Sequence, residues 1–304
     1  MKITVSAPAK INLFLDVLGK RPDGFHEIQS ILAPVTLQDR ITIEETDGAI
    51  ETVADSALRF PGIPWKTNMC ASRDNLATRA ALLLREATGC SKGARITIEK
   101  RVPVNGGLGG GSSDAAATLR GLNTLWRTGL GLERLMELGS QLGCDIPALV
   151  HGGIVTMGGR GELITGIAAK PAQPLWFLLV NPGLGVSTAD IYGRFQRREK
   201  NRSTGRSFNE IVRSLQQGKM EDVAAGAFNA LEEAVFLKYP LLRMLKESLL
   251  AAGAPAALLS GSGATLFAIG RNRGQLEHLA ARVRKDLGCP LWMEPATVAD
   301  NGGN

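Results

Sequence analysis

The stretch that decides the fold is Lys100-Arg-Val-Pro-Val-Asn-Gly-Gly-Leu-Gly-Gly-Gly-Ser-Ser-Asp114. The alternating segment before it, Arg95-Ile-Thr-Ile-Glu99, predicts a strand. A glycine loop follows, and we expect a helix to begin at the serines, because apolar residues then recur at helical spacing: Ala115, Leu119, Leu122 and Trp126. The sequence therefore predicts a strand, a glycine loop and a helix in direct succession.

This arrangement is typical of a phosphate site. Glycines let successive backbone N–H groups point at phosphate oxygens, and the helix N-terminus adds unpaired donors and a positive partial charge. The loop matches neither the G-x-x-x-x-G-K-[ST] pattern nor G-x-G-x-x-G, and the chain has no H-R-D or D-F-G segment of protein kinases. A flexible linker is the alternative, but a linker rarely lies between a clean strand and a helix. We expect Ser112 and Ser113 to cap the helix, donate to phosphate or reach a metal.

Two other segments place polar side chains among apolar ones. Lys10 and Asn12 share one face of the predicted strand Ala7-Pro-Ala-Lys-Ile-Asn-Leu-Phe-Leu15. Asp145 lies in Gly143-Cys-Asp-Ile-Pro147, just before an apolar run. Taken alone, each has an ordinary structural explanation: a lysine that snorkels from a strand, and an aspartate that caps a helix.

Composition is that of a soluble globular enzyme, since 44% of the 304 residues are hydrophobic and 21% are charged. The net charge of +6 allows a polyanionic partner, but the positive charge concentrates only in 194–206, which has no interleaved aromatics and predicts a solvated loop. The longest clean apolar run, 175–180, is too short to span a bilayer. Four cysteines without metal or redox spacing indicate free thiols in the cytoplasm: Cys70, Cys90, Cys144 and Cys289.

Strands and helices alternate along the chain without a strict βαβ rhythm, which predicts the α+β class in both halves. The best linker is 170–174, so we expect domains over 1–168 and 169–299 and a short tail over 300–304. A helix is predicted over 74–87, with Asp74 as its N-cap.

The three polar segments together resemble the GHMP kinase superfamily, the group of galactose, homoserine, mevalonate and phosphomevalonate kinases. Residues 103–113 are similar to its P-x-x-x-G-L-G-x-S-S loop, expanded by extra glycine. Pro8-Ala-Lys-Ile-Asn-Leu-Phe-Leu15, Arg21-Pro-Asp-Gly-Phe-His26 and Gly143-Cys-Asp-Ile-Pro147 resemble one branch, whose substrate is a cytidine diphosphate-linked methylerythritol. The resemblance runs from about residue 5 to about residue 295.

The resemblance implies a two-domain GHMP kinase fold, with an N-terminal ATP-binding domain and a C-terminal α+β substrate domain. It also implies a reaction in the non-mevalonate route to isoprenoid precursors. The γ-phosphoryl group of ATP, with Mg²⁺ present, passes to the 2-hydroxyl of 4-diphosphocytidyl-2-C-methyl-D-erythritol. Asp145 would be the general base and Lys10 would lie beside the acceptor.

The remaining site residues also follow from the resemblance. Adenine would contact Asn75 and Lys100, and ATP would lie along Pro103, Val104, Asn105, Gly106, Gly107, Leu108, Gly109, Gly110, Gly111, Ser112 and Ser113. The cytidyl substrate would contact Asn12, Phe25, His26, Asp145, Thr188 and Tyr192. Ser260-Gly-Ser-Gly-Ala-Thr265 would line the site from the second domain. The metal ligands stay unassigned, with Ser113 a candidate.

Three departures from the family pattern accompany these expectations. Asn105 stands where a small residue is usual, and Phe25 replaces a frequent tyrosine. Ala230 replaces an acidic residue in Ala227-Phe-Asn-Ala-Leu-Glu232, and we assign that stretch no role. Two alternatives stay open: a GHMP kinase for another alcohol, and a non-catalytic nucleotide- or RNA-binding protein. We predict no nucleic acid or membrane partner, and a monomer or weak homodimer.

Overall fold

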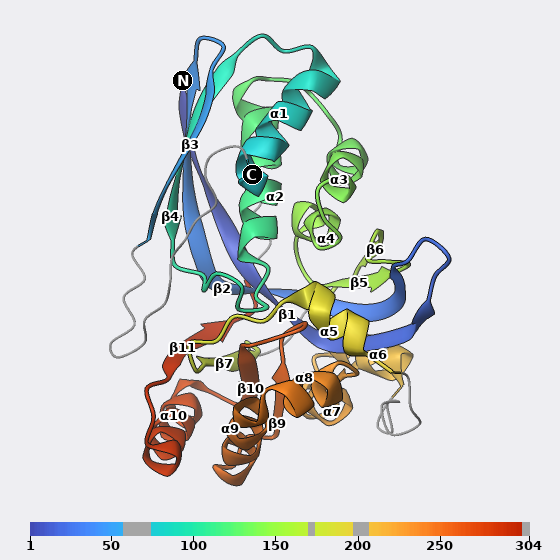
Figure 1. Ribbon diagram of the computed structural model, residues 1–304, viewed down its shortest axis with the longest axis vertical. Coiled ribbons are helices and arrows are strands. Elements are labelled where there is room, and N and C mark those ends of the chain that lie inside the picture. Colours follow the sequence, from blue (N-terminus) through green and yellow to red (C-terminus); the bar gives the residue numbers. More distant parts are fainter. Residues whose placement is uncertain (57–73, 170–173, 197–206, 300–304) are drawn as a thin grey trace.

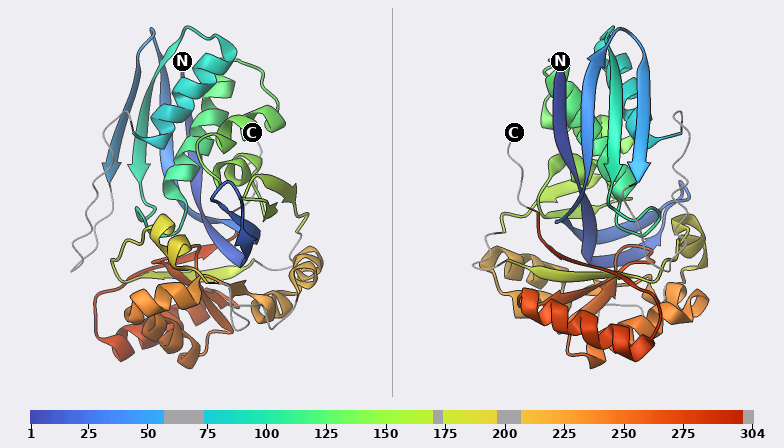
Figure 2. Two further views of the ribbon diagram at one scale, coloured as in Figure 1. Left: turned by 45° about the vertical axis from the view of Figure 1, so that its right-hand side comes forward. Right: turned by 90° about the vertical axis from the view of Figure 1, so that its left-hand side faces the viewer.

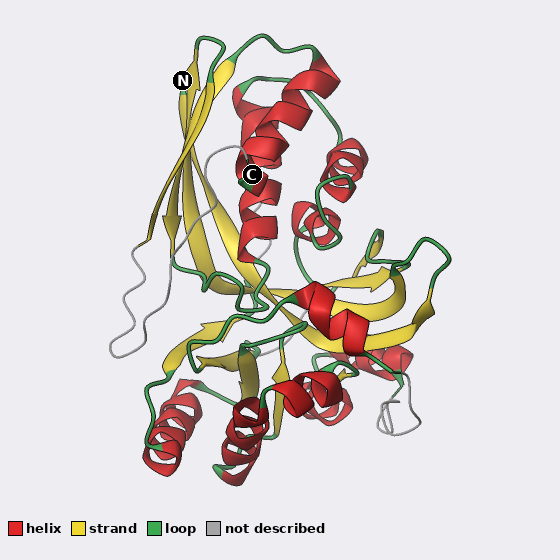
Figure 3. Cartoon of the chain, viewed as in Figure 1, coloured by secondary structure: helices red, strands yellow, loops and turns green. Residues whose placement is uncertain are grey.

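The computed structural model describes residues 1–56, 74–169, 174–196 and 207–299. It contains two sheets with helices packed on them (Figures 1 and 3). The predicted linker at 170–174 falls almost entirely outside the described residues, as do the tail, Cys70 and most of the basic segment 194–206. The α+β class predicted from the sequence is confirmed.

The larger sheet has seven strands, and its main path runs β3-β4-β2-β1-β8, with β5 pairing to β2 and β6 pairing to β5. Its strands are β1 (Lys2–Lys20), β2 (His26–Thr46), β3 (Ile50–Ser56), β4 (Gly93–Lys100), β5 (Val155–Gly158), β6 (Leu163–Gly166) and β8 (Phe228–Asn229). The smaller sheet is antiparallel in the order β11-β7-β10-β9, built from β7 (Trp176–Asn181), β9 (Ala256–Leu259), β10 (Leu266–Gly270) and β11 (Trp292–Thr297).

Helices cover both sheets. The seven-stranded sheet carries α1 (Leu76–Thr88), α2 (Gly110–Leu125), α3 (Leu132–Ser140) and α4 (Ile146–His151) on one side (Figure 2). The second half of the chain contributes α5 (Thr188–Arg194), α6 (Phe208–Gln217), α7 (Met220–Gly226), α8 (Glu232–Lys238), α9 (Pro240–Ala251) and α10 (Arg273–Leu287). Of these, α9 and α10 lie on the side of the smaller sheet that faces away from the larger one (Figure 1).

The two sheets share apolar contacts. One buried cluster joins Ile11, Leu13 and Phe14 of β1 to Phe177 and Leu179 of β7. A separate cluster fills the space between α1, α2 and the larger sheet and draws only on the first half of the chain. The larger sheet therefore packs on helices along one part and on the smaller sheet along another.

The backbone also connects the two halves. Strand β8 pairs in parallel with β1, with Asn229 opposite Leu15. Val298 bridges to Val35, and the backbone N–H of Ala299 donates to the carbonyl of Pro34 at 2.9 Å. The division into domains at 168/169 stays a prediction, but the two halves are joined by hydrogen bonds as well as by apolar packing.

Two helix starts differ from the sequence prediction. The N-cap of α1 is Asn75, whose Oδ1 accepts from the N–H of Ala77 at 2.9 Å, so the prediction of Asp74 is wrong by one residue. Helix α2 begins at Gly110, two residues before the predicted serines, and its N-cap is Gly109 in the left-handed region with no side-chain cap. Glycine takes that conformation without strain, so the loop passes into the helix without needing a serine cap.

Candidate active site

A cavity of about 460 Å³ lies where the glycine loop, β1 and the starts of α1, α4 and α5 meet. It is lined by residues from both halves of the chain: Lys10, Asn12, Leu15, Ile28, Asp74, Asn75, Leu76, Lys100, Pro103, Val104, Asn105, Gly106, Gly107, Gly109, Gly110, Gly111, Ser112, Asp114, Asp145, Met157, Thr188, Tyr192, Gly261 and Ser262. The three polar segments that stand far apart in the sequence therefore meet at one site.

The glycine loop has the geometry of an anion site. Gly107 and Gly109 have φ angles of 78° and 66°, and a Cβ on Gly109 would lie 2.8 Å from Cγ of Lys10. A side chain there would be strained and would displace the lysine. The 16-residue helix α2 starts directly after the loop, and its first residues, Gly110 to Ser112, line the cavity. The unpaired N–H groups of the helix N-terminus therefore lie at the cavity.

Lys10 and Asp145 form an ion pair inside this cavity. Nζ of Lys10 lies 3.4 Å from Oδ2 of Asp145 and donates to Oδ1 of Asn12 at 2.7 Å. Asn12 in turn donates to Oγ of Ser30 at 2.9 Å, which fixes the amide. Register irregularities in the β1–β2 pairing flank Lys10 and Asn12, and both side chains are buried. A buried ammonium with a partner on each side has a fixed position.

Asp145 occupies the N-cap position of α4, but its side chain makes no capping hydrogen bond. The ordinary explanation of a capping aspartate therefore lacks its defining contact. The carboxylate faces Lys10 instead. The lysine, from β1, and the aspartate, from the start of α4, both line the cavity that the glycine loop also borders.

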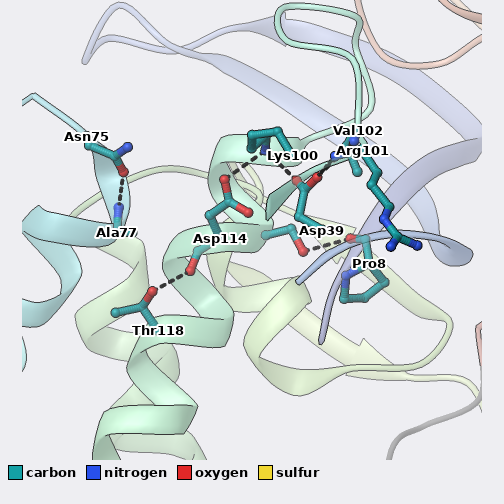
Figure 4. Close-up of polar contacts among 10 residues, drawn as sticks. Pro8, Asp39, Asn75, Ala77, Lys100, Arg101, Val102, Asp114 and Thr118 are labelled. Atoms are coloured by element: carbon teal, nitrogen blue, oxygen red, sulfur yellow. Dashed lines mark hydrogen bonds and ion pairs between the residues drawn. The ribbon is translucent and has the colours of Figure 1, made fainter. Parts of the chain in front are cut away.

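A second lysine, Lys100, is buried and contacts two aspartates (Figure 4). Nζ of Lys100 contacts Oδ2 of Asp39 and lies 2.8 Å from Oδ2 of Asp114, while Oδ1 of Asp39 accepts from the N–H of Val102 at 2.8 Å. Burial, opposed by Lys100, raises the pKa of Asp114 to about 7. Burial alone would lower the pKa of Lys100, but the charges of Asp114 and Asp39 outweigh it and raise that pKa.

This buried triad, Asp39, Lys100 and Asp114, is only partly visible in the sequence. Lys100 was expected at the nucleotide, and it does line the cavity. Its two carboxylate partners were missed, because residues 39 and 100 become neighbours only through the pairing of β2 with β4. Asp114 offered the one available signal, since it ends the glycine motif.

Aromatic and apolar side chains form another part of the lining. Tyr192 lines the cavity, and the ring of His26 packs against the tyrosine ring with centroids 5.1 Å apart. Burial raises the pKa of Tyr192, and burial with nearby Lys20 lowers the pKa of His26. Sequence reasoning missed the apolar lining residues Leu15, Ile28 and Met157, which are indistinguishable from core positions by pattern alone.

Four of the residues expected to contact ATP or the cytidyl substrate do not line the cavity. Phe25 is 47% exposed and lies beneath the guanidinium of Arg160, 5.1 Å from the ring centroid. His26 packs against the ring of Tyr192, and Leu108 is buried while its carbonyl accepts from the N–H of Lys10. Ser113 is also buried and donates to the carbonyl of Pro8 at 2.7 Å, so its hydroxyl joins the first turn of α2 to β1.

Comparison with known proteins shows the family of this chain. Residues 75–153 match the GHMP kinases N terminal domain, and residues 211–288 match the GHMP kinases C terminal domain. A 4-diphosphocytidyl-2-C-methyl-D-erythritol kinase of Geobacillus thermodenitrificans is 42% identical over 280 residues, which is 91% of this chain and 89% of that protein. The chain belongs to this GHMP kinase family. A Bacillus cereus protein of the same name is 43% identical over 270 residues, 88% of each chain.

Solved structures of GHMP kinases agree with the family. A crystal structure of 4-(cytidine 5'-diphospho)-2C-methyl-D-erythritol kinase has a TM-score of 0.74 and 30% identity, covering 98% of this chain and 100% of the other. A homoserine kinase from Cytophaga hutchinsonii has a TM-score of 0.76 at 16% identity, covering 99% and 96%, which shows the shared fold alone. This GHMP kinase has no helix in its described ranges that is long and apolar enough to cross a membrane.

Proposed function

We propose that this GHMP kinase transfers the γ-phosphoryl group of ATP to the 2-hydroxyl of 4-diphosphocytidyl-2-C-methyl-D-erythritol. One observation carries the proposal: the Lys10–Asp145 pair and the glycine loop border a single cavity, in a chain 42% identical to a kinase of that name. Phosphoryl transfer depends mainly on positioning and charge neutralisation, and these groups can supply both.

On the donor side, the glycine loop and the start of α2 would bind the phosphates of ATP. Gly107, Gly109 and Gly110 line the cavity without side chains that would exclude phosphate. The ammonium of Lys100 lies 3.2 Å from where a Cβ on Gly110 would be, but the Asp39 and Asp114 side chains offset its charge. The attraction for a polyanionic ligand therefore comes from the backbone donors of the loop and of the helix start.

On the acceptor side, Asp145 would take the proton of the substrate hydroxyl as its oxygen attacks the γ-phosphorus. The bond to the bridging oxygen breaks, and ADP leaves with that oxygen. Lys10, whose ammonium is held 3.4 Å from the Asp145 carboxylate, would stabilise the negative charge that develops on the attacking oxygen. Asn12 and Ser30 keep that ammonium in place through the hydrogen bonds described above.

The cavity is also compatible with Mg²⁺ as the companion of ATP. Among the described residues, no group of three His, Cys, Asp or Glu side chains is placed to hold a metal. Mg²⁺ in kinases commonly needs only one or two carboxylates besides the phosphates. With Asp145 acting as the base, the lining carboxylate Asp74 would be the protein ligand, and the ion would neutralise phosphate charge.

The specific substrate can be tested by a phosphoryl-transfer assay on purified protein with ATP, Mg²⁺ and a panel of alcohols. We expect turnover of the cytidyl substrate and none of mevalonate or homoserine. Turnover of either of those two alcohols, with none of the cytidyl substrate, would overturn the assignment. The cytoplasmic location and the monomeric or weakly dimeric state stay predictions from the sequence.

A further inference from the structure

The stretch 227–232, to which the sequence analysis gave no role, contains a buried amide with all of its donors in use. Asn229 is 3% exposed. Its Nδ2 donates to the carbonyl of Leu259 at 2.9 Å and to the carbonyl of Gly261 at 2.8 Å. Its Oδ1 accepts from the N–H of Leu231 at 2.9 Å. Only an amide donates twice and accepts once in this geometry, so no other side chain of similar size replaces it.

The two carbonyls that Asn229 holds flank Ser260, the first residue of the loop 260–263. We call this segment the C-terminal glycine loop. Oγ of Ser260 lies 2.9 Å from the carbonyl of Gly107 and 3.2 Å from the carbonyl of Lys10. The loop therefore contacts both the phosphate loop and the strand that carries the lysine.

The C-terminal glycine loop also lies directly against the lysine ammonium. A Cβ on Gly261 would be 3.1 Å from Nζ of Lys10. Gly261 and Ser262 both line the cavity, and Oγ of Ser262 lies 2.8 Å from Oγ1 of Thr188. The position of this loop thus limits where the Lys10 ammonium can stand.

The backbone around Asn229 is held in place by β1. Asn229 pairs with Leu15 in the β1–β8 ladder, and the N–H of Ala230 donates to the carbonyl of Leu15 at 2.8 Å. Glu232 accepts from the N–H of Leu259 at 3.0 Å and is paired with Lys246. The stretch 227–232 therefore connects β1, which carries Lys10, to the backbone on either side of Ser260 in the C-terminal glycine loop.

We propose that Asn229 is a positioning residue of the phosphoryl-transfer site. It holds the C-terminal glycine loop against Lys10 and the phosphate loop, and thereby sets the distance between Lys10 and Asp145. This inference rests on the proposed roles of Lys10 and Asp145. It adds to them a residue that touches neither substrate and lies outside the cavity lining.

The test is a double-mutant cycle of Asn229→Ala and Ser260→Ala, measured as kcat and KM for both substrates. Displacing a catalytic group by about 1 Å can cost about 100-fold in rate, so each single variant should lower kcat by about 10- to 100-fold while both KM values change little. The double variant should lose far less than the product of the single losses, because both changes release the same loop.

Asn123→Ala is the matched control. That amide also bridges backbone groups, since it donates to the carbonyl of Leu130 at 3.1 Å and accepts from its N–H at 3.0 Å, but it does not line or adjoin the cavity. The control should lower Tm and leave kcat near the wild-type value. If Asn229→Ala changes kcat no more than Asn123→Ala at equal loss of Tm, or if the two losses in the cycle simply multiply, Asn229 serves packing alone.

A second readout needs no turnover. Wild-type Lys10 is buried and paired, so it should react slowly with an acylating reagent, as followed by peptide mass spectrometry. Asn229→Ala should speed acylation of Lys10 several-fold, and Asn123→Ala should not. An unchanged acylation rate would overturn the positioning role. Because this comparison uses no alcohol substrate, it separates failure of the positioning role from failure of the proposed substrate.

Discussion

For Asp145, a chemical role as general base and a structural role as helix cap predict different outcomes. Asp145 holds an N-cap position without a capping hydrogen bond, and it faces Lys10. We expect Asp145→Asn to lower kcat by roughly 10²–10⁴-fold, the usual contribution of a general base. Tm and ATP affinity should stay near wild type, because the helix loses no side-chain cap. Kinetics, calorimetry and thermal melts would check these outcomes.

Cys144→Ser is a suitable control for that variant, since it changes the neighbouring residue and leaves the carboxylate in place. It should retain most of kcat. A turnover of Asp145→Asn that matched Cys144→Ser would return Asp145 to a structural role and would remove the proposed mechanism with it.

The aromatic side of the cavity gives a second prediction at the residue scale. Tyr192 lines the cavity, whereas Phe25 is exposed beneath Arg160. Stacking of a base on an aromatic ring contributes roughly 1–3 kcal/mol, so Tyr192→Ala should raise KM for the cytidyl substrate by about 5- to 150-fold with little change in KM for ATP. Phe25→Ala should leave both KM values nearly unchanged. If instead Phe25→Ala has the larger effect, the cytosine binds outside this cavity.

Asp114 should give the protein a pH-dependent stability. Its pKa is raised to about 7 in the folded state, mainly by burial, whereas an unfolded aspartate has a pKa of 3.8. Between those values the unfolded state releases a proton that the folded state keeps. The free energy of unfolding should therefore fall as the pH rises from about 4 to about 7.

The measurement for this group is urea unfolding of wild type and Asp114→Asn at several pH values. The difference between the two free energies should slope across pH 4 to 7 and flatten outside it. Asn123→Ala, which removes no titratable group, is the control and should give no such slope. A difference that is flat across the same range would show that Asp114 is ionised in the folded state throughout.

At the scale of elements, the phosphate loop accommodates an unusual residue in a defined way. Asn105 has a φ of 56°, a left-handed conformation that costs most side chains about 1–2 kcal/mol and that asparagine tolerates. Its carbonyl also accepts from the N–H of Val186 at 3.4 Å. Asn105→Gly should therefore keep KM for ATP, whereas Asn105→Val should lower the free energy of unfolding by about 1–2 kcal/mol and raise KM for ATP. Equal behaviour of the two variants would mean that the conformation at residue 105 is unimportant.

The same loop shows how far sequence reasoning reaches. The order of strand, glycine loop and helix was predictable from periodicity and glycine spacing, and the helix start was missed by two residues because Gly109, and not a serine, occupies the N-cap. Local patterns do not report backbone conformation residue by residue. They report still less about which strands pair in the sheet. The segments around Lys10 and Asp145 were therefore recognised in the sequence, whereas Asp39, which meets Lys100 only through strand pairing, was not.

The stretch 227–232 marks another limit of the same kind. Ala230, which departs from the family pattern, is buried in an apolar cluster that contains Leu15 and Val17 of β1, where an acidic residue would need a partner. The neighbouring Asn229 acts through carbonyl groups 30 and 32 residues away. A hydrogen bond from a side chain to a distant backbone leaves no periodic signal, so its role becomes visible only in three dimensions.

At the scale of the whole molecule, the two halves should unfold together. Ile11 and Phe14 pack against Phe177 in one buried cluster, β1 pairs with β8, and Val35 bridges to Val298. A chain that ended at residue 168 would expose this face of β1, so we expect the fragment 1–168 to bind a dye for exposed apolar surface and to lack a cooperative thermal transition.

Tryptophan fluorescence can follow each half of the intact chain separately. Trp126 is buried at the end of α2, and Trp176 begins β7 in the smaller sheet. Variants that keep only one of these two residues, with the other tryptophans changed to phenylalanine, report on one half each. If the shared cluster couples the halves, the urea midpoint from fluorescence should equal the midpoint from far-ultraviolet circular dichroism in each of the two variants. Fluorescence midpoints that differ from the dichroism midpoint, in opposite directions for the Trp126-only and Trp176-only variants, would mean that the halves unfold independently. The boundary near residue 168 would then separate two independently unfolding units.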